Sequence, residues 1–185
     1  MVIPRNEQPP LSGLMGPYAL VTSNLIILRH RPARILELGT GIGFSTAVMA
    51  AALKDIGRGS IISLEQSAKC VDIASTLIDP DLQPFVRIIQ AAPEIFRIER
   101  LSKWIYFCGY DWRPAPGQEF DFVLVDGPAG WLEDGALVSL DSGDVIRLLP
   151  NLAPGCKVYV DGRRSTVKKL KRYFSHYLRL IERDG

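Results

Sequence analysis

The most constraining feature of the sequence is one strand, loop and helix unit in its first third. An apolar run, Arg34–Leu38, leads into a loop with glycines at Gly39, Gly41 and Gly43, and an alanine-rich stretch covers residues 44–54. A short strand that is joined to a helix by a glycine loop is typical of a parallel sheet, and such loops bind nucleotide-like ligands. The unit therefore predicts both a fold class and a ligand class.

Strand-like and helix-like segments alternate along the rest of the chain. The expected strands are residues 34–38, 60–65, 86–90, 120–126, 157–161 and 177–181. The expected helices are residues 18–30, 44–54, 67–78, 93–99, 142–149 and 165–174. This alternation favours an α/β fold, in which a mostly parallel central sheet is covered by helices on both faces. Ligands of such sheets bind at the carboxyl ends of the strands.

Length and composition indicate one globular domain in a reducing compartment. We expect residues 1–17 to be an irregular arm and residues 18–185 to be a single domain. No run approaches the roughly 20 apolar residues of a membrane helix, so no membrane association is expected. The isolated cysteines Cys70, Cys108 and Cys156 support neither a disulfide framework nor a zinc site. These features predict a cytoplasmic protein.

The spacing of the glycine loop distinguishes between two cofactor classes. A dinucleotide fingerprint needs glycine or alanine where this chain has Phe44. Glu37, two residues before Gly39, would crowd a negatively charged pyrophosphate but would suit an ammonium or a sulfonium group. The loop therefore indicates S-adenosylmethionine rather than NAD.

Four segments resemble motifs of the class I S-adenosylmethionine-dependent methyltransferases. The run 37–43 is similar to motif I of that family, E/D-x-G-x-G-x-G, and Glu65 ends the second strand as the family's ribose-binding acid does. A vicinal diol offers two hydrogen-bond donors, which one carboxylate can accept. Residues 120–128 and 152–161 resemble the strand-four and strand-five motifs of the small catechol-O-methyltransferase-like branch. The likeness covers roughly residues 18–175.

This resemblance implies a three-layer Rossmann-like methyltransferase fold with a shortened C-terminal hairpin. It also implies a set of cofactor-binding residues: Glu37, Gly39, Thr40, Gly41, Gly43, Phe44, Glu65, Gln66, Gln90, Ala91 and Asp126. Two alternatives remain open, because Glu37 would also serve as a structural carboxylate of the loop and Glu65 as a cap of the following helix. The family's usual adenine-binding acid is missing after the third strand, so that contact falls to Gln90, a backbone carbonyl or Glu94.

The catalytic candidates are Asp126 and Asp161, at the ends of the fourth and fifth expected strands. In the metal-dependent branch of the family, acids at these places hold Mg²⁺ together with an asparagine, but Gly162 stands in the asparagine's place. We therefore do not favour a metal, and two carboxylates with several waters remain the alternative. Without metal, Asp126 is the leading base or orienting group for the acceptor. Its structural alternative is a strand-end acid that caps the loop.

The acceptor is expected to be a small molecule that is methylated on oxygen. The amino-methylating run of asparagine, two prolines and an aromatic residue is absent, and Asp126-Gly127-Pro128-Ala129 stands there instead. Candidate substrate contacts are Trp131, Arg163 and Arg164, the last two suited to an anionic group. The aromatic residues Trp104, Tyr106 and Tyr110 are expected to pack rather than to bind cofactor.

Two other function classes remain open, together with a homodimer. The missing adenine acid favours a catalytically inactive scaffold protein, and the basic helix at residues 165–174 favours an RNA or protein methyltransferase. The formal net charge of +2 makes a nucleic acid partner unlikely for the whole protein. A sheet that ends near residue 181 leaves an exposed edge, through which a homodimer is expected.

Overall fold

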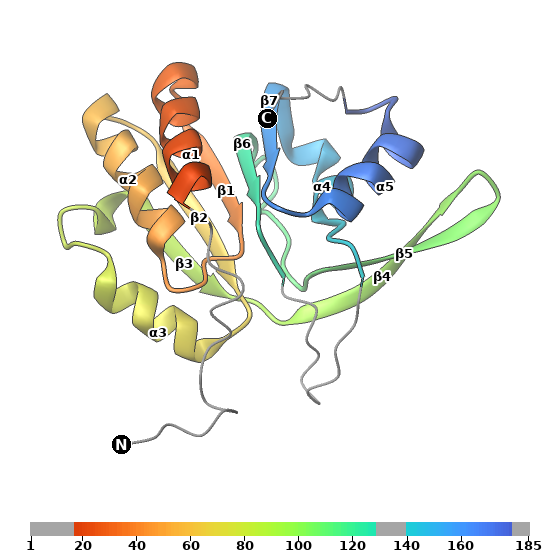
Figure 1. Cartoon of the computed structure of the whole chain (residues 1–185), viewed down its shortest axis with the longest axis horizontal. Coiled ribbons are helices and arrows are strands. Elements are labelled where there is room, and N and C mark those ends of the chain that lie inside the picture. The colour runs from red at the N-terminus through yellow and green to blue at the C-terminus, as the bar shows by residue number, and fades with distance from the viewer. Residues whose placement is uncertain (1–16, 129–139, 179–185) are drawn as a thin grey trace.

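A computed structural model describes residues 17–128 and 140–178, and their side chains from residue 24 onward. Five parallel strands form the central sheet in the order β3-β2-β1-β6-β7 (Figure 1). Their bounds are β1 Arg34–Leu38, β2 Ser60–Glu65, β3 Val86–Gln90, β6 Phe120–Val125 and β7 Leu152–Val160. All five had been predicted, although β7 begins five residues earlier than expected. Strands are added outward from β1 to β3 on one side, and the chain then crosses back to place β6 and β7 on the other side of β1. The strand β1 therefore lies in the middle of the sheet.

Helices cover both faces of this sheet, which confirms the three-layer α/β fold. The helices are α1 Pro17–His30, α2 Phe44–Ile56, α3 Ala68–Leu77, α4 Asp144–Arg147 and α5 Arg164–Phe174. Ile27 of α1 and Met49 of α2 pack on one face of the sheet with Ile35 and Phe122. Leu36 and Val123 point to the other face, where they pack in one cluster with Val145 of α4.

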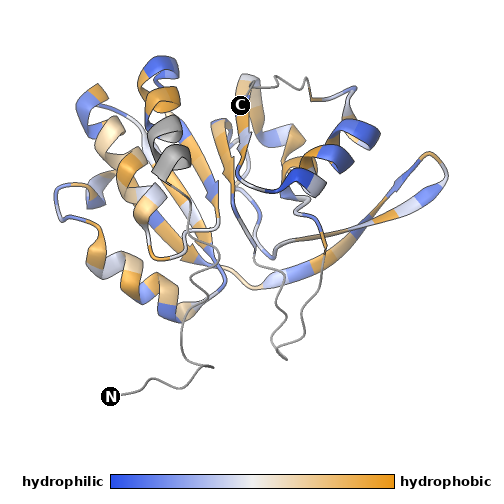
Figure 2. Cartoon of the chain, viewed as in Figure 1, coloured by the Kyte–Doolittle hydropathy of each residue, from blue (hydrophilic) through white to orange (hydrophobic). Residues whose placement is uncertain are grey.

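The central strands are apolar because both of their faces are buried, and α5 is polar on its outer side (Figure 2). Local signals set the helix ends. Gly57 ends α2 in a left-handed conformation, with its N–H bonded to the carbonyls of Leu53 and Lys54. The Ser67 hydroxyl caps α3 by accepting the Cys70 N–H at 3.3 Å. Within the two described ranges, no helix is both long and apolar enough to cross a membrane.

One predicted helix is wrong, because residues 93–99 form a strand. This strand, β4 Pro93–Arg100, pairs antiparallel with β5 Lys103–Tyr110 in a ribbon that extends away from the sheet (Figure 1). One face of the ribbon packs on α5 through Phe96, Ile105 and Phe107, with Leu170 of the helix. This long-range packing overrides the weak local pattern.

Two other predicted elements differ in extent. The expected helix 142–149 is shortened to α4 and a 3-10 turn, η4 Leu149–Asn151, with Pro150 in that turn. The strand expected at 177–181 begins in a turn, since the Tyr177 and Leu178 N–H groups bond to the Phe174 carbonyl, and its remaining residues lie outside the described chain. β7 is thus the last strand of the described sheet. The expected arm also lies outside it, apart from residue 17.

Candidate cofactor and acceptor site

The glycine loop rests on the end of β2 and opens on one side. The Gly39 and Thr40 N–H groups both donate to the Leu64 carbonyl, at 3.0 and 3.1 Å. A Cβ on Gly39 would lie 2.7 Å from the Gly127 nitrogen, so the loops after β1 and β6 are in direct contact. A Cβ on Gly41 would meet no atom of the described residues within 4 Å. Space for a ligand therefore lies beside Gly41.

Glu37 is fully buried beneath this loop and holds it in place. Its carboxylate accepts hydrogen bonds of 2.5 Å from the hydroxyls of Ser45, Thr46 and Ser63. Since the one proton of Ser63 goes to Glu37, the 2.5 Å contact between Ser63 and Thr40 is a donation by Thr40. Burial raises the pKa of Glu37, although the three hydroxyls lower it. The contacts are those of a structural carboxylate, which was the alternative considered for Glu37.

Glu65 ties the open side of the loop to the start of α3. One carboxylate oxygen accepts the Gly41 N–H at 2.8 Å and the other accepts the Ser67 N–H at 2.9 Å. Each oxygen keeps a second lone pair for a ligand hydroxyl. Next to it, the Gln66 Oε1 atom is buried without a hydrogen-bond partner among the described residues. Glu65 beside Gly41 and its neighbour Gln66 therefore both keep unused acceptor capacity.

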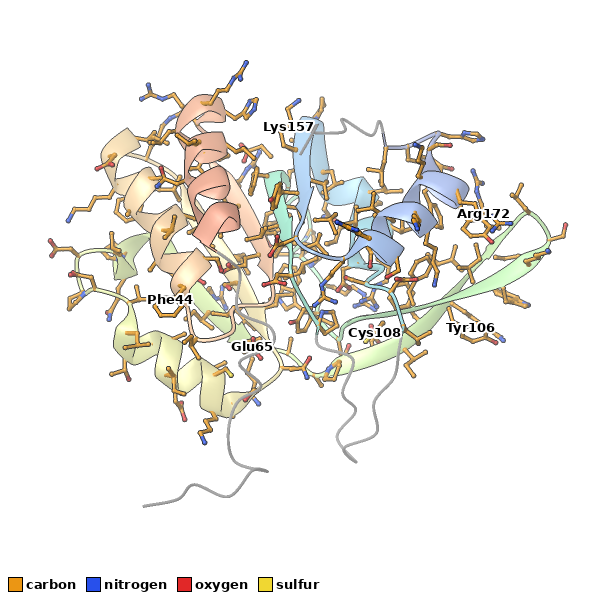
Figure 3. The ribbon with its side chains drawn as sticks, in the orientation of Figure 1. Phe44, Glu65, Tyr106, Cys108, Lys157 and Arg172 are labelled. Carbon is orange, nitrogen blue, oxygen red and sulfur yellow. The ribbon has the colours of Figure 1, made fainter. Side chains whose placement is uncertain are left out.

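Other predicted cofactor residues lie around the same opening. Glu65 and Phe44 both stand at the carboxyl end of the sheet (Figure 3), and the Phe44 side chain is half exposed. Gln90 pairs with Glu65 at the end of β3, and the Ala91 N–H donates to the Glu65 carbonyl at 2.8 Å. Glu94, by contrast, accepts from Arg113 at 2.9 Å and from Arg147, so its carboxylate is occupied elsewhere.

Asp126 and Asp161 are brought together at the ends of the neighbouring strands β6 and β7. The Asp126 N–H donates to the Leu38 carbonyl at 2.8 Å, and the Asp161 N–H to the Val125 carbonyl at 3.0 Å. Burial raises the pKa of Asp126 to about 7, while the Arg163 charge lowers it and Asp161 raises it. Burial also raises the pKa of Asp161, against the effect of Arg163. This pair therefore differs from ordinary surface carboxylates.

The two candidate arginines occupy different environments. The Arg163 guanidinium folds back over the loop after β6 and donates to the carbonyls of Pro128, at 3.3 Å, and Asp126. Arg164 begins α5 and is exposed. Trp131, the third candidate for the acceptor, lies outside the described residues.

Sequence reasoning missed one group at the site, the hydroxyl of Tyr110. Tyr110 ends β5, is buried, and places its hydroxyl against the Gly127 backbone, between the two loops. Burial raises its pKa well above the ordinary value, and Glu65 and Asp126 add to this. Packing had been expected of Tyr110, and it does pack, but its position depends on a ribbon that was not predicted. Trp104 and Tyr106 are half exposed on that ribbon, and Tyr106 lies far from Glu65 (Figure 3).

The arrangement suits S-adenosylmethionine better than it suits a divalent cation. An open glycine loop, a carboxylate with free lone pairs and an unpartnered amide oxygen suit a ligand with polar hydroxyl groups. For a metal, no group of three or more histidine, cysteine, aspartate or glutamate side chains exists in the described part of the chain. The positive charge of Arg163 beside Asp126 and Asp161 also opposes a second cation there.

Solved methyltransferases share this fold. The O-methyltransferase TomG from Streptomyces achromogenes, in complex with SAM, is 18% identical over 86% of this chain and 67% of its own, with a TM-score of 0.57. The precorrin-6y C5,15-methyltransferase from Geobacter metallireducens is 12% identical over 95% of this chain and 79% of its own, with a TM-score of 0.58. The SAH-bound PaMTH1 of Podospora anserina is 18% identical, with a TM-score of 0.54.

At these identities the likeness shows the fold. The chain aligns over 85% of its own residues with PaMTH1 but spans only 57% of that protein. No curated protein gives a significant match. A family comparison is more extensive: residues 36–185 match the family described as "Methyltransferase domain", from the middle of β1 to the last residue. The chain therefore belongs to this methyltransferase-domain family, as the motifs had predicted.

Proposed function

We propose that the protein transfers a methyl group from S-adenosylmethionine to an oxygen atom of a small molecule. The observation that carries this proposal is the Glu65 carboxylate, which accepts the Gly41 N–H at 2.8 Å. Beside it, no atom of the described part of the chain lies within 4 Å of a Gly41 Cβ. In a chain that belongs to the methyltransferase-domain family, we assign this place to the ribose of the cofactor and its neighbouring groups. Gln90, also predicted to bind the cofactor, pairs with Glu65 at the end of β3.

When bound, S-adenosylmethionine supplies a methyl group on a positively charged sulfur, which a nucleophilic oxygen can displace. The residues of this chain would hold that cofactor and align the acceptor. Glu65 and Gln66 would accept hydrogen bonds from it, and the loop 39–43 would support it from below. Glu37 acts indirectly in this proposal, because its oxygens already bind three hydroxyls.

Asp126 would take the proton of the acceptor hydroxyl. A general base works best when its pKa lies near the working pH, and the pKa of Asp126 is raised to about 7. No side-chain hydrogen bond engages the carboxylates of Asp126 or Asp161 within the described residues, so both remain free to receive a proton. Asp161, which adjoins it, would orient the acceptor.

A small acceptor fits the structure better than a nucleic acid does. Part of the basic run in α5 is engaged inside the protein: Lys169 bonds to Asp141 at 2.6 Å and lies 5.1 Å from the Phe107 ring centre. We further propose a homodimer through the edge strand β7, and a reducing compartment, with which the three free cysteines agree. The single domain over residues 18–185 likewise stays a proposal.

Calorimetric titration tests the cofactor assignment first. S-adenosylmethionine and S-adenosylhomocysteine should bind the wild type with micromolar affinity, while NAD should not bind. A panel of phenols and alcohols should then give transfer of a radiolabelled methyl group. Failure of both nucleosides to bind would contradict the proposed function, and binding without transfer to any acceptor would favour the scaffold alternative.

A further inference from the structure

The end of β7 presents an arginine at the place where a metal-dependent relative would need a ligand set. Asp126 and Asp161 are the carboxylates that end β6 and β7, Gly162 has no side chain to add, and Arg163 follows. Magnesium prefers six oxygen ligands, for which two half-buried carboxylates are a poor start. The charge that these carboxylates face comes instead from the protein itself.

Two hydrogen bonds to backbone carbonyls fix this charge in position. The Arg163 guanidinium donates through one terminal nitrogen to Pro128, at 3.3 Å, and through the other to Asp126. Both carbonyls belong to the loop that follows β6, so the arginine bridges the ends of two neighbouring strands. A guanidinium keeps its proton at every physiological pH. The site therefore holds a permanent, immobilised cation.

The effect of this cation reaches each ionisable group around it. Arg163 lowers the pKa values of Asp126, Asp161 and Tyr110, against the burial that raises all three. These groups stand at the ends of β6, β7 and β5, and the guanidinium is itself bonded to the loop after β6. An oxygen that became negatively charged here would experience the same stabilisation.

One donor of the guanidinium also lacks an acceptor. The Nε atom of Arg163 is buried and has no hydrogen-bond partner among the described residues. A buried donor without a partner costs about 1–3 kcal/mol, and native proteins contain few of them. The Nε atom of Arg147 is also unpartnered, but that side chain bonds to Glu94 and Asp144 and lies against the Phe96 ring at 3.9 Å. Arg163 is the one that stands beside the catalytic candidates.

We propose that Arg163 binds and stabilises the ionised oxygen of a phenolic acceptor, and so replaces a divalent metal in this enzyme. This rests on the proposed function and specifies its substrate class. The acceptor would arrive as a neutral phenol, because a permanent anion would meet Asp126 and Asp161. Its proton passes to the Asp126 carboxylate, while the electron pair stays on oxygen beside Arg163. That pair then forms the new C–O bond, as the C–S bond breaks and its pair returns to sulfur.

A chromogenic phenol tests this without measuring turnover. The probes are 4-nitrophenol and 4-nitrocatechol, titrated with pH in the presence of protein saturated with S-adenosylhomocysteine and of EDTA. Absorbance reports the ionised fraction of the bound probe. We expect the bound probe to ionise about tenfold more readily than the free one, a change of about one pKa unit. Added Mg²⁺ should change nothing.

Three variants assign the effect to the guanidinium. Arg163→Gln should abolish the tenfold change, and Arg163→Lys should keep part of it, since the charge remains but the two-pronged hydrogen bonding is lost. Lys168→Gln removes one exposed charge from the same helix and should match the wild type. Because Asp126 titrates in the same range, Asp126→Asn serves as a second background in which the Arg163 effect should persist.

Several results would overturn the proposal. These are equal probe ionisation in the wild type and Arg163→Gln, loss of the effect in EDTA with recovery by Mg²⁺, or no binding of either probe at millimolar concentration. Calorimetry on the same samples keeps this separate from the proposed function. If S-adenosylhomocysteine binds and the probe does not respond, only the role of Arg163 is wrong. If the nucleoside does not bind, the proposed function is wrong, and the titration is repeated without it to test Arg163 alone.

Discussion

Acidic residues stand at the carboxyl ends of strands in both halves of the sheet, buried at β1 and β2 and half-buried at β6 and β7, but their hydrogen bonding is opposite. At the ends of β1 and β2, the carboxylates of Glu37 and Glu65 accept five hydrogen bonds from hydroxyls and backbone N–H groups. At the ends of β6 and β7, the carboxylates of Asp126 and Asp161 accept none from the described residues. Burial and a single arginine determine their charge instead.

We propose that this difference separates cofactor binding from reaction. A cofactor-binding loop, here residues 39–43 with Glu37 and Glu65, must keep its shape before the ligand arrives. Hydrogen bonds to every carboxylate oxygen make it rigid. A proton acceptor must keep a free lone pair and a pKa near the working pH, which saturation would destroy. We therefore expect substitutions in the first half to change cofactor affinity or folding, and substitutions in the second half to change rate. Each prediction below tests that division.

The largest expected effect is that of Asp126→Asn on turnover. Removal of a general base costs about 10²–10⁴-fold in rate. Steady-state kinetics should show this loss, while the dissociation constant for S-adenosylmethionine stays within about tenfold of the wild type, as for one lost hydrogen bond. The wild-type kcat/KM should rise with pH and level off above about 7, where Asp126 is ionised. An unchanged kcat in the variant would leave Asp126 only its loop-capping role.

Two glycine variants should distinguish the backbone packing of the loop 39–43 from the ligand space beside it. Gly39 has φ +104°, and a Cβ there would lie 2.7–2.8 Å from the backbone of Gly127 and Asp126. Gly39→Ala should therefore lower the free energy of unfolding by about 2–4 kcal/mol. The Cβ of Gly41→Ala meets no atom within 4 Å among the residues that the structure describes, so it should cost only about 1 kcal/mol of stability, but it should block the cofactor.

Chemical denaturation followed by calorimetric titration distinguishes the two. The assignment of the ligand space to Gly41 is wrong if Gly41→Ala binds S-adenosylmethionine as the wild type does. The role of Gly39 in backbone packing is wrong if Gly39→Ala is as stable as the wild type.

The first half of the edge was predictable from sequence because its residues follow one another closely. Glu37, the three glycines and Phe44 lie within one strand-to-helix turn, and Glu65 ends the very next strand. The fold of these residues depends on hydrogen bonds between neighbouring segments. Spacing and residue type therefore contained most of the information, although the three hydroxyls that occupy Glu37 were not apparent from it.

The second half depends on contacts that no local pattern contains. Arg163 folds back on the Asp126 carbonyl, 37 residues earlier, and Tyr110 reaches the site from the end of β5. The strand β4 was predicted as a helix because its partner β5 and its support on α5 lie far along the chain. The acids themselves were predictable from their strand-end positions, but their environment was not.

A moderate effect is expected for Glu65→Ala on cofactor affinity. Loss of charge-assisted hydrogen bonds to a ligand, each of about 1.5–3 kcal/mol, should weaken S-adenosylmethionine binding by roughly 10- to 100-fold. The affinity of Glu65→Gln for S-adenosylmethionine should fall between those of the wild type and Glu65→Ala, since the amide oxygen can still accept a hydrogen bond. The matched control is Glu119→Gln, an exposed acid 3.4 Å from Arg34, which should bind as the wild type does. Equal calorimetric affinities for Glu65→Ala and the control would exclude Glu65 as the ribose-binding group.

The smallest expected effect has the opposite sign, because Asp126→Asn should stabilise the fold while it abolishes turnover. The carboxyl titrates near 3.8 when unperturbed and at about 7 in the folded protein. Between these values the folded state holds a proton that the unfolded state has lost, so wild-type stability falls as the pH rises from about 4 to about 7. Asparagine cannot ionise and should escape this loss. At pH 8 the variant should be more stable by about 1–2 kcal/mol, after allowance for partial solvent screening, and at pH 4 it should have no advantage.

Urea unfolding at the two pH values measures this, with the exposed Asp72→Asn as the control that should show no pH-dependent gain. A variant that is less stable than the wild type at pH 8 would mean that the ionised Asp126 is well satisfied in the fold. The contrast between the two halves of the edge would then be wrong. A gain confined to pH 8 would show that this half of the site gives up stability to keep a carboxylate available for proton transfer, as enzymes commonly do.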